Sequence, residues 1–161
     1  MIKYEELQLD EFDAVVTGEL THLAIHLEGE LDNIIIDVFQ VCKVQEFRKL
    51  ILHREGLKFQ DKIEIVRCCI PMLEKVVDPA ELKKTLNEVE AFKAWRNALS
   101  HGHDVGSTSE PLKMRVEIIN RAGKEKIVEI TPESHQVMLD EIDVVLVRLQ
   151  KFAEVINKFE E

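Results

Sequence analysis

Apolar residues recur at steps of three and four positions over the first part of the chain, from about Asp10 to Val41. This spacing places them on one face of a helix. The stripe consists of Leu20, Leu23, Leu27, Leu31, Ile34 or Ile35, and Val38. The pattern predicts one long amphipathic helix, with Gly29 as the place where it would bend.

Two shorter helices are expected next. The first covers about Val44 to His53 and stops at Gly56. The second begins at Phe59-Gln60-Asp61-Lys62-Ile63 and runs to Ile70, where Pro71 is expected to close it because proline lacks the N–H that a helix needs.

A fourth helix has a clear start signal in Asp78-Pro79-Ala80-Glu81. Aspartate suits the N-cap, proline the first helical position and glutamate the third. The helix is expected to end at about His101, with Gly102 in a left-handed cap.

The hydrophobic period then changes from 3.6 to 2. Residues Gly102 to Glu110 are rich in glycine and serine, and we expect a loop there, the most mobile segment of the chain. The alternating stretch Leu112–Ile118 and the stretch Lys126–Ile130 predict two strands joined by a turn at Arg121-Ala122-Gly123-Lys124.

The last helix starts at Thr131-Pro132-Glu133, with a buried stripe of Leu139, Ile142, Leu146, Leu149, Phe152 or Ala153, and Ile156. The pattern as a whole predicts a mostly α protein: an antiparallel helical bundle of about five helices with a β-hairpin, at about residues 112–130, inserted before the last helix. Its 161 residues suit a single domain, 1–161.

The composition narrows the function classes. The acidic N-terminus does not resemble a signal peptide, and no apolar run is long enough for a membrane span, so we expect no membrane association. Three cysteines do not form a disulfide framework, and a reducing, cytoplasmic location is the simpler interpretation. The net charge of −10 disfavours broad contact with nucleic acid, so RNA would be gripped over a few nucleotides only. No sequence feature points to a cofactor.

One segment combines residue types that suit chemistry, Trp95-Arg96-Asn97-Ala98-Leu99-Ser100-His101-Gly102. Arginine offers a permanent charge and a planar fork of donors for phosphate oxygens. Histidine exchanges protons near neutral pH. Arg96 also falls on the apolar stripe of its helix, where an arginine requires a partner, a ligand or another subunit. The other members of this stripe are Leu82, Leu86, Val89 and Phe92.

The geometry of this motif is open to a second interpretation. Arg96 and His101 are five residues apart, a poor spacing within a regular helix, and would meet only if the helix end frays. Alternatively, Arg96 pairs with a carboxylate of another helix, while Asn97 and His101 act as C-terminal caps. The same spacing recurs at Arg48 and His53, where we interpret it as accidental.

The segment resembles the Arg-Asn-x-x-x-His signature of the HEPN superfamily of small α-helical domains. Gly56-Leu57-Lys58-Phe59-Gln60-Asp61-Lys62-Ile63 also resembles the segment that often opens the third helix of these proteins. The likeness covers roughly residues 10 to 160, and only the eight-residue motif is specific.

The resemblance implies a metal-independent endoribonuclease that works as a homodimer, with two motifs meeting in one cleft. Arg96 would bind the scissile phosphate, His101 would act as general acid or base, and Asn97 would orient either of them. Ser100 and His103 are candidate substrate-binding residues. Relatives are often toxins or defence proteins, which suggests a cognate antitoxin or nucleotidyltransferase-like partner. Others are inactive dimerisation or nucleotide- or protein-binding modules, and this is the alternative function.

Two other groups contain residue types that can bind metal or carry redox chemistry. Glu19, His22, His26 and Glu30 share one face of the first helix, but a di-metal site needs a second Glu-x-x-His, which the chain lacks. A single-metal site there is a third hypothesis beside a solvated helix face. Cys68 and Cys69 are interpreted as helix residues with at least one in the core, as is Cys42.

Overall fold

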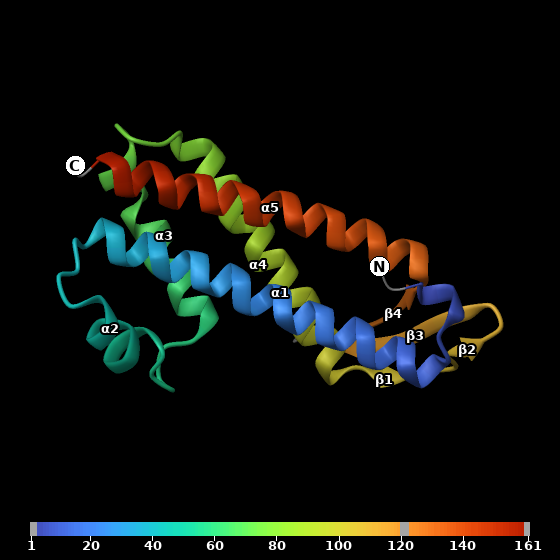
Figure 1. Ribbon diagram of the computed structural model, residues 1–161. Helices are drawn as coiled ribbons and strands as arrows, with labels where there is room; N and C mark the ends of the chain where they lie inside the picture. Colours follow the sequence, from blue (N-terminus) through green and yellow to red (C-terminus); the bar gives the residue numbers. More distant parts are fainter. Residues whose placement is uncertain (1–2, 120–122, 160–161) are drawn as a thin grey trace. The chain divides into compact units, whose positions relative to one another are not determined.

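The computed structural model describes residues 3–119 and 123–159, which are mostly helical with a small antiparallel sheet before the last helix (Figure 1). This confirms the mostly α class. Its α-helices in these ranges are α1 (Leu9–Val38), α2 (Val44–Phe47), α3 (Phe59–Leu73), α4 (Pro79–His101) and α5 (Pro132–Phe159). A 3₁₀ turn, Tyr4–Glu6, precedes α1, and a π-helical turn, Arg48–Leu52, follows α2.

The helix starts follow the capping residues of the sequence. The Asp78 carboxylate accepts a hydrogen bond from the backbone N–H of Ala80 (2.9 Å). Asp78 therefore caps α4, which begins one residue later, at Pro79. At the start of α5, the Ser134 N–H donates to the hydroxyl oxygen of Thr131 (3.2 Å). The expected starts of both helices are confirmed.

The chain forms two compact units, and α1, α4 and α5 contribute residues to both. Unit 1 consists of residues 1–23 and 92–142, and unit 2 of residues 24–91 and 143–161. The predicted single domain of residues 1–161 stays a prediction.

Unit 2 buries the apolar stripes that the sequence predicts on its helices. On α1 these are Leu27, Leu31, Ile34 and Ile35, on α4 Leu82, Leu86 and Val89, and on α5 Leu149, Phe152, Ala153 and Ile156. A charged residue also lies in this core. Lys62 of α3 is 1% exposed and pairs with Asp32, which is 2% exposed.

Helix α3 is longer than the sequence suggests. It continues to Leu73 and contains Pro71, so the expected end at Ile70 is wrong. Proline removes only its own N–H, which would bond to a carbonyl one turn earlier. The two residues after Pro71 keep their donors, and the helix completes its final turn.

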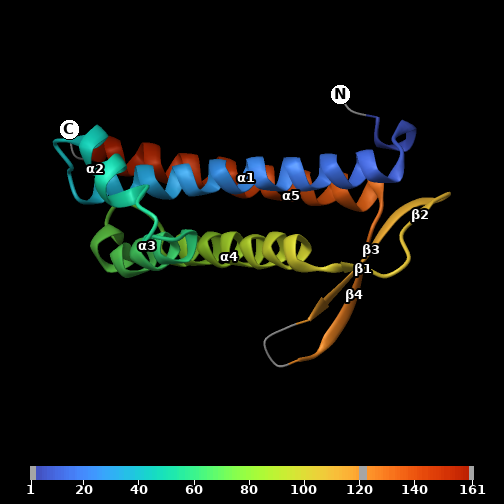
Figure 2. The ribbon, with the colours of Figure 1, turned by 90° about the horizontal axis from the view of Figure 1, so that it is seen from below.

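Unit 1 contains the sheet. The central strand β3 (Leu112–Ile119) pairs antiparallel with β4 (Glu125–Ile130), and this confirms the predicted hairpin (Figure 2). Its buried residues alternate as expected, with Met114 and Val116 below one tenth exposed. Of the predicted turn, Arg121 and Ala122 lie outside the described residues, and Gly123 takes a positive φ of 73°.

The segment before the hairpin is not the loop that we expected. It forms two short strands, β1 (His103–Asp104) and β2 (Thr108–Ser109), which both pair with β3. Between them the Val105 N–H donates to the Arg115 carbonyl (2.9 Å). Strands of two residues are too short to show a hydrophobic period, and their glycine and serine content indicated a loop.

In the described residues, no helix combines the length and apolar character that crossing a membrane requires.

Candidate functional site

The motif lies at the C-terminal end of α4, within unit 1. Arg96 and Asn97 are half-buried, whereas Ser100 and His101 are exposed. His103 is exposed in β1 and lies directly opposite Glu117 of β3. The structure therefore brings the five predicted site residues to one helix end and the strand that follows it.

Asn97 holds the Arg96 guanidinium directly. Nη1 of Arg96 donates to Oδ1 of Asn97 over 2.9 Å, and the Ser100 hydroxyl donates to the Arg96 carbonyl over 3.0 Å. Nε of Arg96 is buried and has no hydrogen-bond partner among the described residues. Within that same part of the chain, the guanidinium makes no ion pair. The alternative in which Arg96 pairs with a carboxylate of another helix is therefore wrong for these residues.

Arg96 lines a pocket of about 500 Å³ in unit 1. The α4 end adds Leu99, Ser100 and Gly102, and α1 and the residue before it add Gln8, Asp10, Asp13, Val16, Thr17 and Leu20. The sheet and its connections add Asp104, Ser107, Ser109, Met114 and Val116. Asn97 and His101 do not line it. The pocket lining thus combines apolar residues with one arginine, several serine and threonine residues and three aspartates.

The structure does not turn His101 toward Arg96. Helix α4 continues through His101, so the frayed end that would bring the two side chains together is not present. At 100° per residue, five residues place two side chains about 140° apart around the helix axis. Within one chain, Arg96 lines the pocket, while His101 is exposed on another side of α4.

Gly102 fixes the helix end to the sheet. The expected left-handed cap is wrong, because the glycines with positive φ in the described residues are Gly106 and Gly123. A Cβ on Gly102 would lie 2.1 Å from Cγ1 of Val116 and 3.1 Å from the carbonyl oxygen of Glu117. Glycine is needed here because the backbone approaches β3 closely.

Sequence reasoning missed the pocket carboxylates. Asp10 and Asp13 are three residues apart on α1 and therefore share a helix face, a spacing that the sequence contains. Asp104 belongs to the segment that we expected to be a loop. Its Oδ1 accepts hydrogen bonds from the N–H groups of Gly106 (2.8 Å) and Ser107 (3.1 Å). The Ser107 side chain and these two amides lower the pKa of Asp104, which stays ionised.

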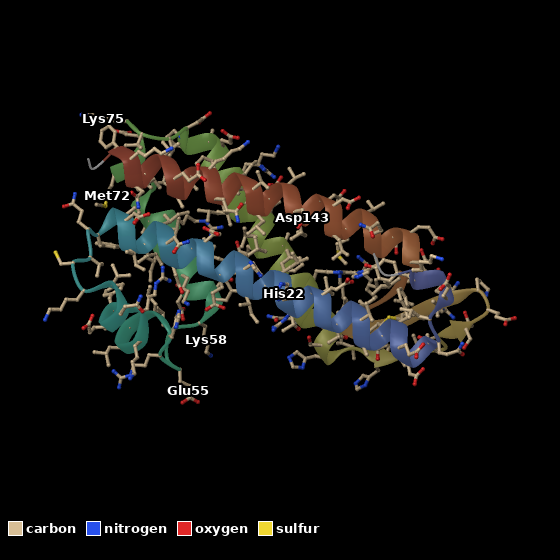
Figure 3. All side chains as sticks on the ribbon, in the orientation of Figure 1. His22, Glu55, Lys58, Met72, Lys75 and Asp143 are labelled. Carbon is tan, nitrogen blue, oxygen red and sulfur yellow. The ribbon has the colours of Figure 1, made fainter. Side chains whose placement is uncertain are left out.

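The helix face with His22 and His26 was the candidate for a metal site. Among the described residues, no group of three or more His, Cys, Asp or Glu side chains can hold a metal ion. Glu19 accepts hydrogen bonds from Tyr4 and pairs with His135 (2.7 Å), and Glu30 accepts one from Asn33 (2.9 Å). Their carboxylates are thus engaged, and His22 lies on an exposed side of α1 (Figure 3).

The second Arg-x-x-x-x-His pattern is structural. The Arg48 guanidinium donates to Oδ1 of Asn33 (2.6 Å), and His53 lies 3.1 Å from the Asp32 carboxylate. Both partners belong to unit 2, so this pair is committed to internal contacts. Of the cysteines, Cys69 is buried, and Cys42 and Cys68 are exposed, so the core position expected for Cys42 is wrong.

No protein-family model, no curated protein and no solved structure matches this chain.

Proposed function

We propose that this protein is a HEPN-like, metal-independent endoribonuclease whose site is completed by a second copy of the chain. The observation that carries the proposal is the state of Arg96. Arg96 lines a pocket, and its guanidinium is held by Asn97 and has no carboxylate partner in the described part of the chain. A half-buried arginine without a carboxylate partner can bind an anion, and in RNA the phosphodiester group is that anion.

The proposed reaction divides the work between two side chains. Arg96 holds the non-bridging phosphate oxygens and stabilises the charge that they gain in the transition state. His101 takes the proton of the ribose 2′-hydroxyl or gives a proton to the departing 5′-oxygen. The 2′-oxygen forms a bond to phosphorus as the bond to the 5′-oxygen breaks. The products are a 2′,3′-cyclic phosphate and a 5′-hydroxyl.

A second copy is part of the proposal because of the helix geometry. In one chain, Arg96 and His101 point about 140° apart around α4, so they do not converge on one phosphate. A two-fold dimer would place His101 of one protomer beside Arg96 of its partner. The same proposal includes an antiparallel helical bundle and RNA binding by Ser100 and His103. It also includes action in the cytoplasm and control by a cognate partner protein.

The test is cleavage of a mixed-sequence RNA in excess EDTA by wild type, Arg96→Ala and His101→Ala. We expect wild type to cut and both variants to lose activity by about 10²-fold or more. Arg54→Ala and His26→Ala are matched controls, because they remove the same kinds of side chain from exposed positions in unit 2. They are expected to cut like wild type.

Mixing the two inactive variants tests the shared site. If Arg96 and His101 act across the dimer, a heterodimer contains one intact site, and an equal mixture regains about one quarter of wild-type activity. If both residues act within one chain, the mixture stays inactive. No cleavage by folded, dimeric wild type would refute the nuclease proposal.

A second candidate is the inactive binding module. It is favoured by one observation: the pocket that contains Arg96 also contains Asp10, Asp13 and Asp104, which repel a polyanion. In this case the protein binds a nucleotide or a protein segment without cutting RNA. The EDTA assay separates the two functions, because only the nuclease yields a 2′,3′-cyclic phosphate.

A further inference from the structure

We propose that the pocket beside Arg96 is a guanine-specific subsite, which seats the base next to the phosphate held by Arg96. The inference rests on the proposed function in taking a single RNA strand as the ligand. The pocket volume of about 500 Å³ lies in the range of small-molecule sites, roughly 300–1,000 Å³, and accommodates one nucleotide.

The lining residues provide an apolar surface for a base and a cation for a phosphate, as a nucleotide requires. Leu20, Leu99 and Val116 give the apolar surface that the face of a base requires. Arg96 supplies the cation for the phosphate, and the hydroxyls of Thr17 and Ser109 supply adaptable hydrogen bonds. Sequence-specific recognition of RNA uses single strands, whose bases are read along their Watson–Crick edges.

The carboxylates select the base. An ionised carboxylate is an acceptor only, with two oxygens side by side. Guanine presents two adjacent donors on its Watson–Crick edge, N1–H and the N2 amino group, which match both oxygens of one carboxylate. Adenine and cytosine present one amino donor next to an acceptor nitrogen, and uracil presents one N–H between two carbonyls. Each of these bases would set a lone pair against the carboxylate.

Asp10 and Asp13 are the carboxylates assigned to this edge. Both are exposed residues on one face of α1 that line the pocket, so their carboxylates are open to a ligand. Asp104 has a different part. Its Oδ1 is occupied by the Gly106 and Ser107 amides, which hold this carboxylate in one orientation.

The test measures binding without cleavage. Isothermal titration calorimetry in EDTA compares 3′-GMP, 3′-AMP, 3′-CMP and 3′-UMP on the full-length protein. We expect 3′-GMP to bind about tenfold or more tightly than the other three, because guanine offers two donors to one carboxylate, whereas each of the other bases places a lone pair against it. The double variant Asp10→Asn/Asp13→Asn is expected to lose this preference.

The control is Glu141→Gln/Asp143→Asn, which removes two charges from exposed positions on α5. Asp143 is labelled in Figure 3. Removal of negative charge reduces repulsion of every anionic nucleotide. A loss confined to 3′-GMP in the pocket variant is therefore opposite to the general electrostatic effect. The control variant is expected to keep the preference for 3′-GMP.

The outcomes separate this inference from the proposed function. Equal binding of all four nucleotides, or a preference that survives Asp10→Asn/Asp13→Asn, overturns the guanine subsite, whether or not RNA is cut. A preference for 3′-GMP that is lost in the pocket variant supports the subsite, even if wild type fails to cut RNA. If RNA is cut, guanosine is expected at one fixed position beside the cleavage points.

Discussion

The buried charge cluster of unit 2 allows a stability prediction to be worked from distances. Nζ of Lys62 lies 2.9 Å from Oδ1 of Asp32 and 2.7 Å from Oε1 of Glu28. Lys62 and Asp32 are almost completely buried, whereas the Glu28 side chain is 34% exposed. A charged lysine in this core is tolerated because two carboxylates face it.

The perturbation is Lys62→Met, which keeps the length of the side chain and removes its charge. At an effective dielectric constant of ~20, a charge pair 2.9 Å apart attracts by about 6 kcal/mol. Part of this attraction offsets the cost of burying both ions. Removal of Lys62 leaves the buried Asp32 carboxylate with His53 (3.1 Å) as its remaining hydrogen-bond partner, and the loss of one partner of a buried ion pair costs about 3–5 kcal/mol. We expect the free energy of unfolding to fall by about 4 kcal/mol.

The assay is equilibrium urea unfolding followed by far-ultraviolet circular dichroism. Lys58→Met is the matched control, because Lys58 is exposed at the start of the same helix (Figure 3), and its loss is expected to cost less than about 0.5 kcal/mol. The double variant Lys62→Met/Asp32→Leu is expected to recover at least half of the loss, since it also removes the buried carboxylate. A loss below about 1 kcal/mol for Lys62→Met, or strictly additive effects in the double variant, would refute this reasoning.

Three further predictions concern other contacts. Gly102→Ala is expected to lower the free energy of unfolding by about 1–3 kcal/mol, because its Cβ would lie 2.1 Å from Cγ1 of Val116; a double-mutant cycle with Val116→Ala should show strong coupling, and additivity would contradict the contact. Burial and a hydrogen bond to Glu19 raise the pKa of Tyr4 to about 12. Since this folded-state pKa lies above the unfolded value of ~10, the stabilisation is complete below pH ~10 and is lost, up to about 3 kcal/mol, as the pH rises toward 12. Tyr4 is the only tyrosine, so tyrosinate absorbance measures it directly, and equal midpoints for folded and urea-unfolded protein would exclude the shift. Burial raises the pKa of the Cys69 thiol, so the other two cysteines should react with a thiol reagent first, and equal rates for all three would count against its burial.

The sequence by itself determined the local elements. The caps at Asp78 and Thr131 and the change of period after residue 110 predict α4, α5 and the β3–β4 hairpin, because they act through neighbouring residues. The sequence also indicated that Arg96 is unusual, because it is a charged residue at a position of the helical repeat where the other residues are apolar. This pattern can be recognised without the tertiary structure.

Tertiary structure decided what each anomaly meets. The chain around Arg96 gives no hint that Asp10, Asp13 and Asp104 line the same pocket, since these contacts join segments far apart in the sequence. Gly102 has a cap-like setting, yet its role comes from the approach of Val116 on another strand. In the sequence, Lys62 resembles a surface lysine in the first turn of α3. Its burial is possible because the carboxylates of Glu28 and Asp32 on α1 pair with it. Pairing of distant charges and close backbone contacts depends on the packing of elements, and the local pattern carries no information about it.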